Sequence, residues 1–167
     1  PDPEIRKCYL SVLYMGMTGI QVEKFFLANG CGRNGKGLIN DLYSDMLGDE
    51  YFYKLSADVL TSKCDLAKGA SPQVANMDNK RCIISSEPDD DSFVKIRMNM
   101  IKDLTGCKEI NARQLYSSNT KVRMKQVQIL ECNKKPQLSG RIDLSVMERI
   151  IDIPFVSFFT DKSDEWN

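Results

Sequence analysis

The chain contains no histidine. This absence excludes a Ser-His-Asp triad, a Cys-His pair, a histidine-ligated zinc ion and a histidine general base. The six cysteines lie 18 to 33 residues apart and form no C-x-x-C pair, so a zinc site is not expected. Free, mostly buried thiols in a reducing compartment are the simpler interpretation. Any chemistry must therefore use carboxylates, lysine, arginine, hydroxyls, backbone amides or a bound cation.

A long apolar run and a net charge are missing as well. No apolar run approaches the roughly 20 residues that a membrane helix needs, and no signal peptide opens the chain, so we expect an intracellular, cytoplasmic protein with no membrane partner. Lys plus Arg and Asp plus Glu both number 23, so net charge favours no partner. The 167 residues are 42% hydrophobic, which is enough to form the core of about one domain.

Hydrophobic spacing predicts strands and helices that alternate along the chain. Helices are expected over residues 4–15, 39–47, 94–104 and 142–149, with another near 72–78. Strands are expected over residues 20–28, 51–55, 81–86, 127–130 and 150–156, with a hairpin over 110–125. The alternation favours an α/β domain with a mostly parallel sheet that helices cover on both faces.

The sharpest motif is the segment GCGRNGKG (30–37), which fits G-x-x-x-x-G-K. Glycines let backbone N–H groups turn inward around a phosphate, Lys36 supplies charge to the β- and γ-phosphates, and the next helix adds its dipole. Position 37 is Gly, where this loop usually carries a hydroxyl that binds Mg²⁺. The alternative is a glycine-rich β-turn. The nucleotide-binding candidates are Gly30, Gly32, Asn34, Gly35, Lys36 and Gly37.

Two polar residues follow predicted strands at the edge where ligands of parallel sheets bind. Glu87 ends the 81–86 strand and is the candidate to hold Mg²⁺ or orient the attacking water. The acid that usually precedes such a Glu is replaced by Ser86. Asn133 follows the 127–130 strand and could hold water or contact the γ-phosphate. A solvated acidic turn and an ordinary strand-ending turn are the respective alternatives.

Basic residues concentrate between positions 95 and 135, a segment that contains ten Lys or Arg and only three acidic residues. Lys121, Arg123 and Lys125 alternate along a predicted strand and so share one face. Such a stripe could follow a phosphate backbone, with binding that weakens as salt rises. A solvated strand face is the equally open alternative.

With these segments in order, the chain resembles the superfamily 3 helicases, in particular the helicase module of primase–helicases from large DNA viruses, phages and plasmids. The resemblance is carried by the nucleotide loop (30–37) and by RCIISSEP (81–88), which is similar to the family's motif B. It is carried further by IKDLTGCKEINARQLY (101–116), QILECNKKP (128–136) and RIIDIPF (149–155). In the 101–116 segment, Lys108 or Glu109 stands where the family commonly has Asp.

The resemblance implies the fold of an additional-strand, AAA+-like P-loop ATPase with a protruding β-hairpin. It also implies ATP and Mg²⁺ as cofactors, single-stranded or forked DNA as partner, a hexameric ring with 3′-to-5′ unwinding, and a primase domain in the full-length protein. Residues 1–19 would then form a helix leading into the core, 20–159 the ATPase domain, and 160–167 a tail truncated from a longer protein. A viral protein would work at the replication site in the host cell.

Site roles follow from the same resemblance. Arg149 would reach the ATP site of a neighbouring subunit, with a surface ion pair as the alternative. The hairpin would grip DNA in the ring's channel, with contacts from Arg113, Lys121 and Arg123. Lys36, Glu87, Asn133 and Arg149 are thus the catalytic candidates. Two other functions stay open: a P-loop kinase or other nucleotide-handling enzyme, and a hydrolysis-dead DNA-binding scaffold, which Gly37 and Ser86 would favour.

Overall fold

The fold is described from a computed structural model of the full 167-residue chain. The residues that it describes are 2–61, 72–86, 95–113, 119–140 and 143–162, without the side chains of 113, 119 and 120.

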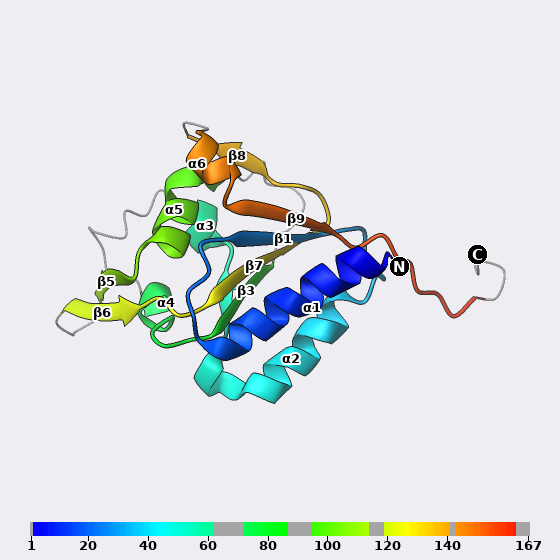
Figure 1. The fold of residues 1–167 in the computed structure, drawn as a ribbon, viewed down its shortest axis with the longest axis horizontal. Coiled ribbons are helices and arrows are strands. Elements are labelled where there is room, and N and C mark those ends of the chain that lie inside the picture. The colour runs from blue at the N-terminus through cyan, green and yellow to red at the C-terminus, as the bar shows by residue number, and fades with distance from the viewer. Residues whose placement is uncertain (1, 62–71, 87–94, 114–118, 141–142, 163–167) are drawn as a thin grey trace.

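A five-stranded parallel sheet with the order β2-β3-β7-β1-β9 forms the centre of the molecule (Figure 1). Its strands are β1 (Phe25–Asn29), β2 (Phe52–Ser56), β3 (Cys82–Ser86), β7 (Val127–Cys132) and β9 (Ile150–Pro154). The first four residues of β1, β3 and β7 are all buried, because helices cover both faces of a parallel sheet. The predicted α/β fold with a mostly parallel central sheet is confirmed.

Two helices cover one face of the sheet: α1 (Pro3–Thr18) and α2 (Lys36–Tyr51), which lie side by side in Figure 1. Asp2 caps α1 by accepting a hydrogen bond from the backbone N–H of Glu4 (2.9 Å), and Gly19 ends the helix in the left-handed conformation. Tyr9 and Tyr43 pack from these helices into a buried cluster with Phe26 of the sheet.

The opposite face is covered by α5 (Met98–Gly106), with the short helices α3 (Asp58–Thr61), α4 (Pro72–Ala75) and α6 (Leu144–Met147) nearby. Ile101 and Leu104 of α5 belong to the larger buried cluster, together with Leu27 and Leu130 of the sheet. The core therefore lies in two layers, one on each side of the sheet.

Two small sheets accompany the central one. β4 (Lys95–Arg97) pairs with β8 (Gln137–Ser139), and β5 (Glu109–Arg113) pairs antiparallel with β6 (Asn119–Arg123). The β5–β6 hairpin projects from the body of the molecule on the left of Figure 1. This arrangement is the predicted protruding hairpin, although the expected turn at 117–119 falls mostly outside the described residues.

Two predicted elements were wrong in part. Residues 20–24 are not strand, because Gln21 and Lys24 donate to carbonyls of other segments and the ladder begins only at Phe25. The helix expected from residue 94 begins at Met98, because Ile96 is buried and pairs with Leu138 in β4–β8.

The five described cysteines form no disulfides with one another, and the expectation that the thiols are mostly buried was wrong for these five. Cys8, Cys31 and Cys107 are exposed, and Cys82 and Cys132 are buried. Among the residues that the structure describes, no helix is long and apolar enough to cross a membrane.

Candidate functional site

The strands β1, β7 and β3 end at one edge of the sheet. Asn29 is level with Cys132, and Ser86 is level with Glu131. Because the strands are parallel, the segments that follow them emerge together at this edge. The glycine loop and Asn133 are two of these segments.

The glycine loop needs its glycines for two different reasons. A Cβ on Gly30 would lie 2.2 Å from the carbonyl oxygen of Phe155, so only glycine permits this close approach. Gly35 has a φ of 81°, in the left-handed region, and immediately precedes α2. The loop thus delivers Lys36 as the first residue of α2.

Asn34 and Lys36 are buried within the loop, with 6% and 7% of their surfaces exposed. The Asn34 amide donates to the carbonyls of Cys31 and Phe155, and its oxygen accepts from the backbone N–H of Lys36 (3.3 Å). The Lys36 ammonium donates to the carbonyl oxygens of Gly30 and Cys132, the latter at 3.2 Å. The lysine is therefore held over the ends of β1 and β7 by neutral acceptors.

A cavity of about 390 Å³ opens above this lysine. Its walls come from the loop, the first turn of α2 and the ends of β3 and β7; they include Gly32, Asn34, Gly35, Lys36, Gly37, Ser86, Glu131 and Asn133. A lysine at a helix N-terminus with a glycine-rich loop in front is suited to bind an anion such as a phosphate chain. Of the six loop candidates, only Gly30 is not in the wall; it supplies a carbonyl to Lys36 instead.

A second, more apolar cavity of about 910 Å³ adjoins the first and shares Arg33, Asn34, Gly35 and Leu38 with it. Its other walls come from α1 and from residues 154–161. A ligand with a charged part and a flat apolar part could use both cavities.

Glu131 is a site residue that the sequence reasoning missed. Its carboxylate accepts hydrogen bonds from the side-chain amide of Asn40 (2.6 Å) and from the hydroxyl of Ser86 (3.3 Å). The available signal was an acid inside the mostly apolar run VQILEC of β7, directly after four buried residues. An isolated acid in such a run is rare enough to mark a site.

The pocket can supply oxygen ligands to Mg²⁺. Mg²⁺ usually takes one or two protein carboxylates and completes its shell with substrate phosphates and water. Glu131 and Ser86 provide a carboxylate and a hydroxyl in the same pocket wall as Lys36, so the residues present fit the ion. Within the described part of the chain, no group of three acidic or sulfur ligands could hold a metal alone.

The remaining catalytic candidates are placed differently. Glu87, predicted to hold Mg²⁺, lies outside the described residues. Asn133 is exposed and lines the same cavity as Lys36.

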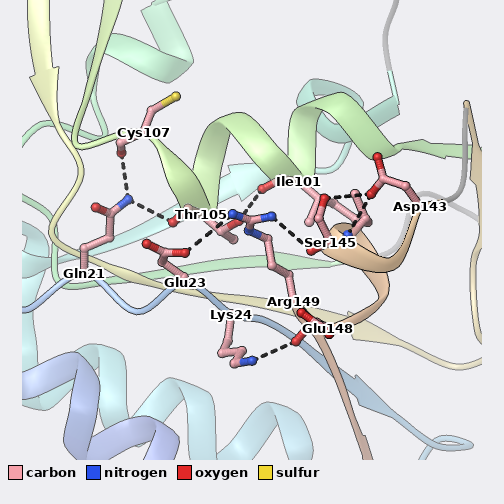
Figure 2. Close-up of polar contacts among 11 residues, drawn as sticks. Gln21, Glu23, Lys24, Ile101, Thr105, Cys107, Asp143, Ser145, Glu148 and Arg149 are labelled. Atoms are coloured by element: carbon pink, nitrogen blue, oxygen red, sulfur yellow. Dashed lines mark hydrogen bonds and ion pairs between the residues drawn. The ribbon is translucent and has the colours of Figure 1, made fainter.

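Arg149 is not brought to this pocket within the chain. It directly precedes β9, at the end of the sheet opposite to the one where β1 and β7 finish. Its guanidinium donates to the carbonyl of Ser145 (3.0 Å) and pairs with Glu23 (3.5 Å), as Figure 2 shows. The end of α5 lies close by, because a Cβ on Gly106 would be 3.4 Å from a terminal nitrogen of this guanidinium.

The DNA-contact candidates lie on the hairpin. Lys121 and Arg123 of β6 are both exposed and share one face, with buried Val122 between them on the other. Lys121 forms an exposed ion pair with Glu109 across the hairpin (3.5 Å). Arg113 ends β5 opposite Asn119.

Comparison with known proteins gives relatives from large DNA viruses, although no family model matches the sequence. A protein of Acanthamoeba polyphaga mimivirus named as a helicase, L207/L206, is 30% identical over 165 residues, covering 98% of this chain and 17% of its own length. Primase D5 of Fowlpox virus is 30% identical over 162 residues, covering 95% of this chain and 20% of its own. Uncoating factor OPG117 of Vaccinia virus is 33% identical over 133 residues, covering 77% and 16%.

Solved structures agree in fold. The apo NrS-1 C terminal region superposes with a TM-score of 0.64 at 18% identity, over all of this chain and 41% of that one. JCV Helicase superposes with a TM-score of 0.52 at 11% identity, over 92% of this chain and 41% of that one. The chain resembles the superfamily 3 helicases, as its sequence motifs indicated. Its fold is the P-loop fold that the sequence resemblance implied. The chain spans 17% to 20% of the length of the mimivirus and Fowlpox relatives.

Proposed function

We propose that this chain is the ATP-hydrolysing module of a helicase that moves along DNA in the replication of a large DNA virus, working as a hexameric ring inside the infected cell. The observation that carries the proposal is the placement of Lys36. It sits at the start of α2, beneath a cavity walled by the glycine loop, and at the edge where β1, β3 and β7 end. Relatives named helicase and primase support the assignment to replication.

The triphosphate would occupy the cavity above Lys36, and the nucleoside would extend into the adjoining apolar cavity. Lys36 would exchange its contacts with the carbonyls of Gly30 and Cys132 for phosphate oxygens. The backbone N–H groups of the loop and the N-terminus of α2 would add further donors. Such preorganised donors stabilise the charge that develops during phosphoryl transfer.

Other residues would complete the reaction. Mg²⁺, when bound, neutralises phosphate charge and orients the phosphates for in-line attack. On this chain, Ser86, Glu131 and the predicted Glu87 would surround the ion's water shell. Asn133 would hold the attacking water, and Arg149 of a neighbouring subunit would stabilise the charge on the γ-phosphate.

Cys31 allows a direct test of nucleotide binding, because it is an exposed thiol inside the glycine loop. We expect ATP to protect Cys31 from a maleimide, with modification mapped by mass spectrometry. Cys8 and Cys107 are exposed elsewhere and serve as internal controls whose labelling ATP should not change. Protection should disappear in Lys36→Ala, which removes the charge that attracts the phosphates.

Hydrolysis is tested by the ATPase rate as a function of protein concentration, with and without single-stranded DNA, using Lys36→Ala as the blank. A rate that rises more steeply than linearly and increases with DNA is expected for a motor with shared sites. Protection of Cys31 with a linear rate that ignores DNA would instead favour a kinase or another nucleotide-handling enzyme. Equal labelling of Cys31 with and without ATP would contradict nucleotide binding itself.

A further inference from the structure

We infer that Glu131 is the carboxylate that holds the hydrated Mg²⁺ ion of the nucleotide from the β7 strand, and that Asn40 and Tyr9 are positioning residues for it. The inference rests on the proposed function, because it concerns the same pocket. It assigns a role to a residue that lies in the 128–136 motif but received no predicted role, and it connects the N-terminal helix α1 to the pocket.

Glu131 is placed for this role by the strand order. β7 lies between β1, which leads into the glycine loop, and β3, which leads toward Glu87. Glu131 and Lys36 line the same cavity, so a phosphate chain held by the lysine would bring its cation near this carboxylate.

The carboxylate is oriented by two neutral donors, one on each oxygen. Asn40 donates to Oε1 (2.6 Å) and Ser86 donates to Oε2 (3.3 Å). A carboxylate has about four lone-pair sites, so two such bonds leave acceptor capacity for a metal-bound water. Of the Lys and Arg side chains that the structure describes, none forms an ion pair with Glu131.

Tyr9 fixes the orientation of the Asn40 amide. Its hydroxyl donates to Asn40 Oδ1, which leaves Nδ2 to face Glu131. Tyr9 and Asn40 are buried, with 3% and 4% of their surfaces exposed. Burial, reinforced by the charge of Glu131, raises the pKa of the Tyr9 hydroxyl above its usual value, so the group stays a donor at physiological pH.

Folding alone does not account for a charge at position 131. A glutamine there could accept from Asn40 and donate to Ser86 with the same shape, and it would avoid the cost of a partly buried, unpaired anion. The negative charge at position 131 therefore lowers the stability of the folded chain, and a cation bound in the pocket would offset that loss. This is the step that separates a metal-holding role from a purely structural one.

The decisive experiment measures the binding of a fluorescent ATP analogue to the full chain as Mg²⁺ is titrated, starting in EDTA. Glu131→Gln should bind the analogue in EDTA at least as tightly as the wild type, because one negative charge is removed from the pocket. The Mg²⁺ concentration that gives half of the affinity gain should rise about 10- to 100-fold. Glu50→Gln, on the exposed far end of α2, is the matched control and should leave the Mg²⁺ titration unchanged.

The positioning residues are tested by a pair of tyrosine variants. Tyr9→Phe should shift the Mg²⁺ titration in the same direction by about three- to tenfold, as expected for one lost hydrogen bond. Tyr43→Phe removes a hydroxyl from the same helical layer, where it donates to the carbonyl of Leu13 (2.6 Å), and should not shift the titration. If Glu131→Gln does not fold, this pair still decides the question.

Three outcomes would overturn the inference. One is that folded Glu131→Gln needs the same Mg²⁺ concentration as the wild type for half of the affinity gain. Another is that Glu131→Gln loses analogue affinity equally with and without Mg²⁺. The third is an equal shift in Tyr9→Phe and Tyr43→Phe. A wild-type chain that binds no analogue under any condition would overturn the proposed function as well, which separates the two failures.

Discussion

At the scale of single residues, position 37 makes the clearest prediction. A Cβ on Gly37 would meet no heavy atom within 4 Å, so the missing hydroxyl is not a steric requirement. Gly37→Ser should stabilise the chain by about 0.5 kcal/mol through higher helix propensity, and should increase the affinity for ATP in Mg²⁺ but not in EDTA. Thermal unfolding and nucleotide titrations measure the two effects. Gly32→Ser is the control: a Cβ there also meets no heavy atom within 4 Å, but the residue lies before α2, so it should give no gain in stability. A loss of Mg²⁺-dependent affinity in Gly37→Ser would contradict the prediction.

The same scale shows which parts of the site the sequence could predict. The glycine loop and Lys36 were predictable, because the spacing of the glycines and the lysine can be read from the sequence without knowledge of the fold. Glu131 was not, because its partners Asn40 and Ser86 come from other elements and meet only in the folded sheet. Arg149 was predicted from resemblance alone, and its contacts with Ser145 and Glu23 could not be derived from spacing.

At the scale of elements, the β5–β6 hairpin makes a prediction about DNA. Lys121→Ala should weaken binding to single-stranded DNA similarly for all sequences, and should reduce the slope of log K against log salt by about 0.7. The existing ion pair with Glu109 is exposed, so its loss should cost little stability. Lys7→Ala is the control, because Lys7 is exposed and belongs to α1, whose N-terminal end lies on the opposite side of the molecule from the hairpin in Figure 1. Fluorescence anisotropy at several salt concentrations measures the slope. Equal slopes for the wild type and Lys121→Ala would show that Lys121 does not contact the DNA.

Helices and strands were predictable wherever the apolar residues followed one clear pattern along the sequence. The inner strands β1, β3 and β7 are buried on both faces over most of their length, so they appear in the sequence as mostly apolar runs. Short elements were missed, because β8 and the start of β4 depend on pairing with each other across about 40 residues. Such long-range pairing leaves little local signal.

At the scale of the whole molecule, the nucleotide pocket and Arg149 lie at opposite ends of the sheet. Lys36 follows the carboxyl end of β1, whereas Arg149 precedes β9, the neighbouring strand in the same parallel ladder. One chain therefore cannot bring this arginine to its own pocket without rebuilding the sheet. A head-to-tail contact between copies, which a closed ring requires, could place the arginine of one chain at the lysine of the next.

Mixing two inactive variants tests this arrangement. Lys36→Ala and Arg149→Ala should each hydrolyse ATP poorly, and a trans arginine can contribute roughly 10³- to 10⁵-fold in rate. In mixed rings, an intact pocket of an Arg149→Ala chain would meet the intact arginine of a Lys36→Ala chain, so the mixture should recover part of the wild-type rate. If Arg149 acted within its own chain, or only paired with Glu23, no mixture could contain a complete site. Mixed oligomers detected by native mass spectrometry without recovered ATPase activity would therefore contradict the shared site, because assembly would have occurred and the arginine would still be missing from the reaction.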